Sequence, residues 1–324
     1  MKPLSSSYVK PSATVFDSAI NNWGRVPVGK PRAYPRADDP RVVDGMIFPN
    51  LLPRFTLKPG ETVFTIGSCF AREIERHLDD FDLPTMRIAL GPELVQGAPN
   101  SILNEYNAAS MSQRIAWAIS GRDTTAMTSL TSRVEGGSVD LLLSKGEPVG
   151  EDKILEIRGM IDKVYTALPV ADCVILTLGM TEAWYDNETG VYLNRLPNLR
   201  EVLAQPQRFS FVNMTPQSCH QYMAEGIQEL LGRGVTKILL TVSPVPLAAT
   251  FEKRDCFVAN GYSKATLRVA AEMLTRDFPQ VDYFPSYEMV MSGGMNAYLP
   301  DHQHARPEVV AQIMDHLVRN YIER

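Results

Sequence analysis

The sequence predicts a three-layer α/β/α sandwich with a parallel sheet, and two patterns in the chain carry this prediction. Short apolar segments without polar alternation are typical of parallel strands buried on both faces. Amphipathic helical segments separate them, and an alternation of strands and helices favours a parallel sheet covered by helices on both sides. The 324 residues, 44% of them hydrophobic, suffice for one large domain of this class or for two small ones.

Residues 1–54 are predicted to form a proline-rich extension packed on the main domain, residues 55–324. Eight of the 23 prolines lie within the first 53 residues, and proline at this density prevents helices and favours extended backbone. The extension also contains Trp23, Phe48 and Leu51, which are apolar enough to anchor it to the domain.

The first half of the main domain begins with a β-branched and aromatic strand at 62–66, and a helix follows at Arg72–Asp80. Pro84–Ala89 is a candidate second strand, and a loop rich in glycine and proline comes after it. Ser110–Ile119 has an apolar helical face. The segment near 120–150, rich in glycine, serine and threonine, is predicted to be an irregular insertion with room for a hairpin.

The second half of the domain alternates regularly between helices and strands. Helices are predicted at Glu151–Leu168, Pro216–Arg233, Arg254–Phe278 and Arg306–Tyr321, and strands at Asp172–Leu178, Lys237–Val242 and Val281–Phe284. A second surface insertion is predicted near 186–215. Because ligands of open parallel sheets bind beyond the carboxyl ends of the strands, we expect a site at that edge.

Charge and cysteine usage exclude several classes of function. The chain has 32 basic and 37 acidic side chains, and a net charge of −5 argues against a nucleic-acid surface. No apolar run is long enough to span a bilayer, and the polar run Lys2–Lys10 lacks the apolar core of a signal peptide. Four cysteines without disulfide-framework spacing indicate a reduced, soluble, cytoplasmic protein, although a leaderless export route is compatible with the same pattern.

Cys69 is the candidate nucleophile, because it follows the first strand and a glycine and begins a helix. Free backbone N–H groups and the helix dipole favour an anion there, so we expect the pKa of the Cys69 thiol to be lowered. Ser68 is expected to cap the same helix. The alternative is a buried cysteine that only packs, since free cysteine is among the most buried residue types.

Gly67-Ser68-Cys69-Phe70-Ala71 resembles the motif that gives the GSCFA family its name, and that family resembles the SGNH/GDSL-like hydrolases. Further segments match the family in order: Tyr106-Asn107 with Ser110, Leu178–Trp184, Thr241–Val245, Ser263-Lys264, Phe284–Glu288 and Asp301-x-x-His304. The resemblance covers roughly residues 55–320, the span of one domain of ordinary size. It implies an SGNH-hydrolase-like fold with a flavodoxin-like strand order.

The resemblance implies a nucleophile, a base and an orienting carboxylate. Cys69 stands at the place of the nucleophilic serine, which implies a thioester intermediate, and Ser68 is the alternative nucleophile. His304 is implied as the general base and Asp301 as the residue that orients it. His302, between them, is interpreted as a surface residue or an outer neighbour of the site.

The resemblance also implies an oxyanion hole. Gly179 begins the block in which Thr181 stands at the place of an asparagine, and a hydroxyl donates one hydrogen bond. The backbone N–H of Cys69 is a second donor. Asn107 is a third, with an Asx turn as its alternative role. Glu182 either serves the site or begins a helix, and the helix is the favoured interpretation.

Together these residues predict an ester-directed acyl hydrolase or O-acyltransferase without a cofactor. The implied substrate is a small-molecule or glycan ester, and the sequence does not determine the acyl acceptor or the oligomeric state. Two other classes stay open: a non-catalytic binding module on the same fold, and a metal-dependent hydrolase centred on Asp301, His302 and His304. The metal alternative lacks a further ligand at suitable spacing.

Overall fold

The computed structural model describes residues 33–78 and 101–323. The chain divides into two compact units, Met1–Asn50 and Leu51–Arg324. In the first unit, β1 (Val42–Val43) and β2 (Met46–Ile47) pair as a short antiparallel hairpin. Asp44 and Gly45 connect them with φ angles of 51° and 79°, the left-handed backbone that a tight hairpin turn requires. The packing of the extension on the domain stays a prediction.

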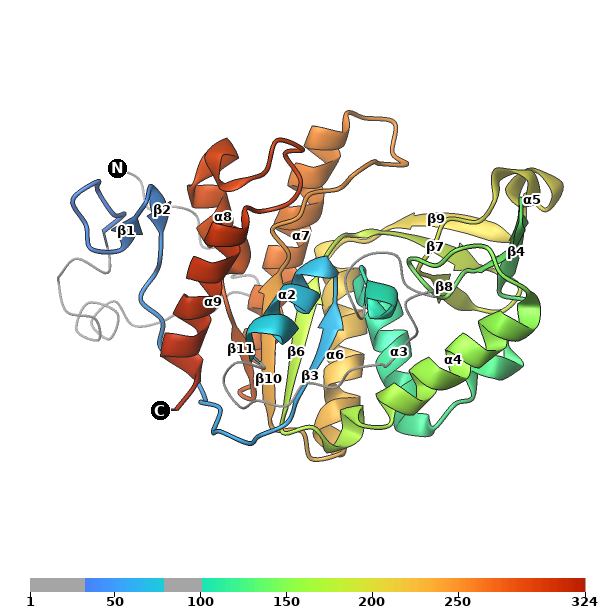
Figure 1. Cartoon of the computed structure of the whole chain (residues 1–324), viewed down its shortest axis with the longest axis horizontal. Coiled ribbons are helices and arrows are strands. Elements are labelled where there is room, and N and C mark those ends of the chain that lie inside the picture. The colour runs from blue at the N-terminus through green and yellow to red at the C-terminus, as the bar shows by residue number, and fades with distance from the viewer. Residues whose placement is uncertain (1–32, 79–100, 324) are drawn as a thin grey trace, which may run out of the picture. The chain divides into compact units, whose positions relative to one another are not determined.

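A four-stranded parallel sheet forms the centre of the second unit (Figure 1). Its spatial order is β11 (Val281–Tyr283), β10 (Lys237–Val242), β6 (Cys173–Leu178) and β3 (Val63–Gly67). Every residue of β3 and β6 is buried, which explains why these strands are apolar without alternation. The predicted strand at 84–89 lies outside the described residues.

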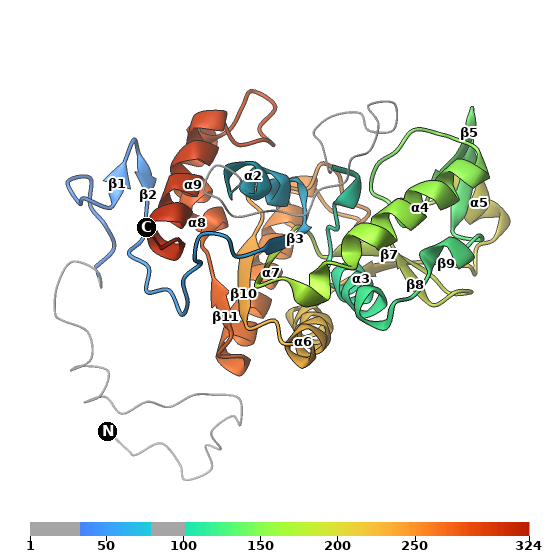
Figure 2. The same cartoon turned by 60° about the horizontal axis from the view of Figure 1, so that its bottom comes forward.

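Helices cover both faces of the sheet, which confirms the predicted three-layer α/β/α fold. They are α2 (Cys69–Leu78), α3 (Ala108–Ser120), α4 (Glu151–Tyr165), α6 (Pro216–Gly232), α7 (Cys256–Asp277), α8 (Ser286–Ser292) and α9 (Pro307–Tyr321). Figure 2 shows α2 and α9 on one side of the sheet and α6 on the other. The helices α3 and α7 pack beside α6, and the main apolar core lies between these three and the sheet.

A smaller antiparallel sheet extends from the end of β6, visible beside α4 and α5 in Figure 1. It consists of β8 (Val191–Leu193), β7 (Glu182–Asp186) and β9 (Phe209–Asn213), and α5 (Leu199–Ala204) lies between β8 and β9 along the chain. The expectation that Glu182 begins a helix is therefore wrong. Pairing with β8 and β9, which are distant in sequence, decides the conformation of this segment.

The segment expected to be the first insertion contains a hairpin of β4 (Thr131–Val134) and β5 (Gly137–Asp140). Arg158 of α4 holds β5 through two hydrogen bonds of 2.7 Å to the Asp140 carboxylate. Short 3₁₀ helices occupy Ser101–Leu103, Thr124–Ala126, Leu168–Val170 and Gly294–Ala297. A second core cluster, which includes Trp117, Leu142 and Phe209, packs these additions together.

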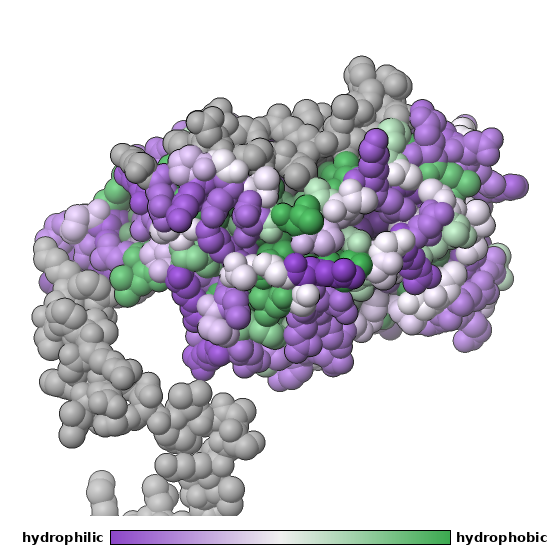
Figure 3. Space-filling model, turned by 90° about the horizontal axis from the view of Figure 1, so that it is seen from below, coloured by the Kyte–Doolittle hydropathy of each residue, from purple (hydrophilic) through white to green (hydrophobic). Residues whose placement is uncertain are grey.

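The surface in Figure 3, at the end of the sheet where the strands begin, is mainly hydrophilic with scattered hydrophobic residues. None of the helices within 33–78 and 101–323 is both long and apolar enough to cross a membrane.

Candidate functional site

The candidate nucleophile lies directly beyond the carboxyl end of β3. Only Ser68 separates the strand from α2, which begins at Cys69. Gly67 makes this tight passage possible, because a Cβ atom there would lie 2.5 Å from the Thr177 carbonyl oxygen of the neighbouring strand β6. Cys69 is partly buried, and the N–H groups of the first turn of α2 precede the first intrahelical hydrogen bond.

The Ser68 side chain does not cap α2. Its hydroxyl is enclosed, with the residue 2% exposed, and it makes no hydrogen bond within the described part of the chain. The expectation of a serine cap is therefore wrong. Buried hydroxyls almost always make hydrogen bonds. The unsatisfied Ser68 hydroxyl beside Cys69 is therefore not explained by helix stability.

Three segments that are far apart in sequence meet at this turn. The Tyr106 carbonyl accepts hydrogen bonds from the N–H groups of Gly179 and Met180, at 3.0 and 2.9 Å. A Cβ atom on Gly179 would lie 2.9 Å from that carbonyl oxygen and 3.3 Å from the Ser68 Cβ. The structure thus brings the predicted segments around Ser68, Asn107 and Gly179 together at the carboxyl edge of the sheet.

Asn107 has the local, backbone-binding role that was predicted as its alternative. Its Oδ1 accepts a hydrogen bond of 2.9 Å from the Ser110 N–H and so caps α3. Its Nδ2 makes no hydrogen bond to a residue within 33–78 or 101–323, although Asn107 is only 3% exposed. The role of Asn107 as an oxyanion donor stays a prediction.

Thr181, in contrast, has its hydroxyl proton committed. The hydroxyl donates to Asn213 Oδ1 at 2.7 Å, and the Thr181 N–H donates to Ser263 Oγ at 3.1 Å. Since a hydroxyl has one proton to donate, Thr181 contributes nothing to an oxyanion in this arrangement. Its observed role is to fix the turn after β6 to β9 and α7.

Glu182 also has a structural role. Its carboxylate accepts hydrogen bonds from the Thr250 hydroxyl and, at 3.0 Å, from the Phe251 N–H. Glu182 therefore fastens the loop before α7 to the start of β7. Trp184, two residues further on, packs its ring against Phe211 and Phe251 with centroids 5.7 and 5.2 Å apart.

Asp301 and His304 form the predicted pair. Asp301 Oδ2 lies 2.7 Å from His304 Nδ1, which leaves Nε2 as the reactive nitrogen, and Oδ1 accepts from the N–H groups of Gln303 and His304. These hydrogen bonds lower the pKa of Asp301 to about 2. Both side chains are accessible, at 43% and 57% exposure. His302 is exposed with φ at 55° and belongs to the turn.

The pair lies in the loop before α9, beyond the same end of the sheet as Cys69 (Figure 1). No hydrogen bond or ion pair joins Cys69 to His304 in the described structure. The Asp301–His304 pair is thus preformed within its own loop. No group of three or more potential metal ligands occurs among the described residues, those around Asp301, His302 and His304 included.

Burial raises the pKa of the Cys69 thiol, so the predicted lowering is wrong. Two lysines oppose the effect of burial, Lys145 and Lys264, while Glu73 adds to it. Cys69 is therefore a thiol at rest. A nucleophilic role requires a base that takes its proton as the reaction proceeds.

Lys264 and Tyr106 belong to this site; the sequence placed both in segments that resemble the family but assigned neither a role. Lys264 is fully buried on α7, and its Nζ donates to the Gly179 carbonyl at 2.7 Å. Burial lowers the pKa of Lys264 to about 7, and Cys69 opposes that shift. One signal was present in the sequence: Lys264 continues the buried stripe of Leu267, Ala271 and Leu274 at helical spacing.

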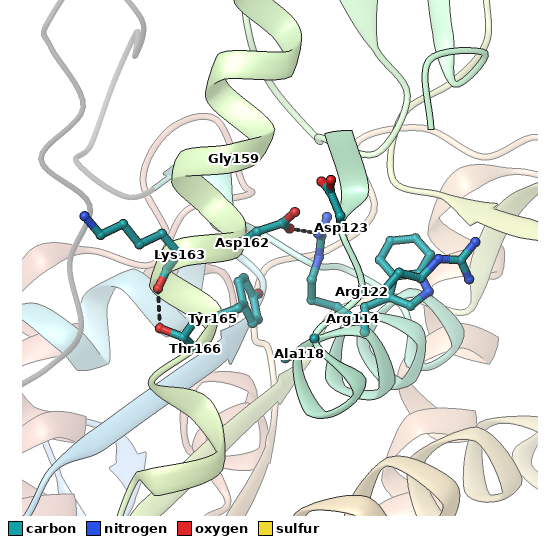
Figure 4. Close-up of a pocket in the computed structure, with 11 residues that line it drawn as sticks. Arg114, Ala118, Arg122, Asp123, Gly159, Asp162, Lys163, Tyr165 and Thr166 are labelled. Atoms are coloured by element: carbon teal, nitrogen blue, oxygen red, sulfur yellow. Dashed lines mark hydrogen bonds and ion pairs between the residues drawn. The ribbon is translucent and has the colours of Figure 1, made fainter. Parts of the chain in front are cut away.

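A cavity of about 380 Å³ lies elsewhere, between the carboxyl ends of α3 and α4 (Figure 4). Asn107 caps the opposite end of α3, and thirteen residues at 1.5 Å each separate the two ends by about 20 Å. Asp162 and Asp123 in its wall already accept hydrogen bonds from Thr124 and Thr125. This cavity is therefore distinct from the turn at Cys69.

A model described as the GSCFA family matches residues 62–317, a span that includes the Cys69 turn, the Tyr106–Asn107 segment and the Asp301–His304 pair. No curated protein matches the chain.

Proposed function

We propose that this chain, which belongs to the GSCFA family, is an acyl-transfer enzyme with Cys69 as nucleophile, His304 as general base and Asp301 as the residue that orients His304. We place it among SGNH/GDSL-like hydrolases of the cytoplasm, acting on a small-molecule or glycan ester. The observation that carries the proposal is the turn itself, where a partly accessible thiol adjoins an unsatisfied buried serine hydroxyl and the segments of Gly179 and Tyr106–Asn107 meet.

The reaction follows from the positions of these groups. His304 Nε2 takes the Cys69 proton as Sγ attacks the ester carbonyl, and the oxyanion is held by the Cys69 N–H and Asn107 Nδ2. His304 then gives the proton to the leaving alkoxide, which leaves an acyl thioester on Cys69. Water or a sugar hydroxyl, deprotonated by His304, attacks the thioester carbonyl; the acyl group stays on the incoming oxygen, the Cys69 thiolate leaves, and His304 returns the proton to it. Asp301 holds the Nδ1–H tautomer throughout.

Trapping the acyl-enzyme tests this proposal. We expect p-nitrophenyl acetate to add one acetyl group to Cys69, visible by mass spectrometry of the intact protein and its peptides. Cys69→Ala should abolish the adduct, and His304→Ala should slow its formation by roughly 10²–10⁴-fold, as for loss of a general base. Cys256→Ala, which removes the other partly exposed thiol, is the matched control and should change nothing. Acetylation confined to other residues would contradict the proposal.

One observation favours a second candidate, a binding module. The Cys69 thiol has a raised pKa and no contact with His304, as expected if the turn only binds an ester. Glucose pentaacetate separates the two functions. A binding module should bind it equally well before and after Cys69→Ala without releasing acetate, whereas the proposed enzyme releases acetate and loses this activity with Cys69.

A further inference from the structure

We infer that Lys264 is a positioning residue that pairs electrostatically with Cys69, so that the buried ammonium stabilises the thiolate that forms during the reaction. This inference rests on the proposed function of Cys69. It adds a cation from α7, behind the turn, to the groups that act on the nucleophile.

The placement of Lys264 is hard to explain by stability alone. Its side chain is fully buried and makes one hydrogen bond, from Nζ to the Gly179 carbonyl. No carboxylate within the described residues forms an ion pair with it. Buried lysines without a carboxylate partner cost free energy, so their retention points to a role in chemistry.

Cys69 is the ionisable group beside this contact. It follows Ser68, whose side chain adjoins Gly179, the residue that Lys264 Nζ binds. Among the described residues, Cys69 is also the group whose charge raises the pKa of Lys264 against the effect of burial. The other charged or titratable groups around Cys69 are Lys145 in the loop after β5, Glu73 on α2 and Tyr106. Lys145 is exposed, so solvent and salt screen it, whereas Lys264 is shielded from both.

The hydrogen bond to Gly179 makes the pairing local to the site. Gly179 adjoins Ser68, and Ser263, the neighbour of Lys264, accepts the Thr181 N–H. Two consecutive residues of α7 therefore hold both ends of the turn after β6. When the Cys69 proton leaves Sγ for His304, the thiolate strengthens proton binding at Lys264 Nζ, which takes one proton from solvent if it was neutral.

The test measures the charge coupling in both directions. Alkylation of each cysteine by iodoacetamide is followed by mass spectrometry between pH 6 and 10. We expect Lys264→Met to slow the alkylation of Cys69 about fivefold near pH 7, where Lys264 is partly charged, and to leave the rate at pH 10 unchanged, where Lys264 is neutral. The profile of Cys256, on the same sample, should stay unchanged. Lys145→Met should also slow the alkylation of Cys69, but this effect should disappear in 0.5 M salt, whereas the effect of Lys264→Met at pH 7 persists.

A second measurement leaves Lys264 in place, in case Lys264→Met does not fold. The ε-carbon NMR signal of Lys264 is titrated in the Cys69→Asp and Cys69→Asn variants. A carboxylate at the position of the thiolate should move the Lys264 midpoint to higher pH than the uncharged amide of the same shape does. Equal midpoints, or an unchanged Cys69 profile in Lys264→Met, would overturn the pairing. Neither measurement needs turnover, so the two proposals can fail separately. If the acyl-enzyme forms but Lys264 and Cys69 are not coupled, only the Lys264–Cys69 pairing is refuted. If they are coupled but no acyl-enzyme forms, only the proposed function is refuted.

Discussion

At the scale of single residues, burial decides the chemistry of this site more strongly than helix position does. Cys69 begins a helix, yet burial raises the pKa of its thiol. Lys264 is a cation by type, yet burial lowers its pKa to about 7. Burial destabilises the charged form of each group, and this causes both pKa shifts. When both groups are charged, their mutual attraction offsets the desolvation cost of each. The two residues are therefore best understood together.

The lowered pKa of Lys264 predicts how stability depends on pH. Between pH 7 and about 10.4, the usual lysine pKa, the unfolded chain binds a proton at Lys264 that the folded chain does not. Where the unfolded chain binds more protons than the folded chain, a rise in pH destabilises the unfolded chain. The free energy of unfolding should therefore increase across this window, by up to about 1.4 kcal/mol per pH unit.

Urea unfolding at pH 7, 8, 9 and 10 checks this expectation. The difference between the unaltered chain and Lys264→Met isolates the contribution of Lys264, because all other titrating groups are shared. Parallel stability curves for the two proteins would show that the folded pKa of Lys264 is not lowered.

Gly67 supports a second prediction at this scale. A methyl group there would lie 2.5 Å from the Thr177 carbonyl, so Gly67→Ala must push β3 away from β6. We expect a loss of about 2 kcal/mol in unfolding free energy, as for overpacking elsewhere. Gly232→Ala, at the open end of α6 with nothing within 4 Å, is the matched control and should not destabilise. Similar losses in both variants would contradict the steric explanation.

At the scale of elements, buried side chains attach the added hairpin and small sheet to the central domain. The guanidinium group of Arg158 on α4 donates hydrogen bonds to both carboxylate oxygens of Asp140 on β5. It also donates to the backbone carbonyls of Met127 and Leu130. Both charges are almost fully enclosed. The ion pair therefore determines where the hairpin sits on α4, and removal of one partner leaves the other charge buried.

Arg158→Met should accordingly cost about 3–5 kcal/mol, the usual loss when a buried ion pair is broken. The double variant Arg158→Met with Asp140→Leu should recover much of this loss, because it leaves no charge unpaired. Chemical denaturation measures both. Lys153→Met, which breaks an exposed pair with Glu156, should stay within about 0.5 kcal/mol. If the double variant is as unstable as Arg158→Met alone, the unpaired Asp140 charge does not explain the loss of stability.

At the scale of the whole second unit, its two ends close on each other. The Leu57 N–H donates to the Tyr321 carbonyl and the Glu323 N–H donates to the Leu57 carbonyl, at 2.6 and 2.8 Å. Near the same end, Arg54 Nη1 donates to the carbonyls of Thr275, Phe278 and Val281. The start of the unit thus completes the hydrogen bonding of α7 and β11.

Arg54→Met removes all three of these hydrogen bonds. We expect a loss of about 2–3 kcal/mol, since hydrogen bonds from charged groups contribute roughly 1.5–3 kcal/mol and these three share one nitrogen. Thermal unfolding followed by circular dichroism is sufficient to measure it. Arg319→Met, which removes an exposed arginine 3.8 Å from Asp315, is the control and should have little effect.

The sequence predicted the layers of this unit well and its local hydrogen bonds poorly. Lys237–Val242 was predicted to be a strand with the bounds that β10 has, because a strand buried on both faces leaves its pattern within six adjacent residues. The strand at Glu182 was missed, because its partners lie in β8 and β9. The hydrogen bond from the Thr181 hydroxyl to Asn213 could not be predicted either, because Asn213 is distant from Thr181 in sequence.

The loop that carries Asp301 and His304 separates two properties of the proposed base. The orientation of the His304 ring depends on hydrogen bonds within residues 299–304. The position of the loop depends on a distant contact, the hydrogen bond of 3.1 Å from the Tyr298 hydroxyl to the Pro244 carbonyl after β10. Substitutions at Tyr298 should therefore change where the proposed base lies relative to Cys69 while Asp301 keeps its orientation.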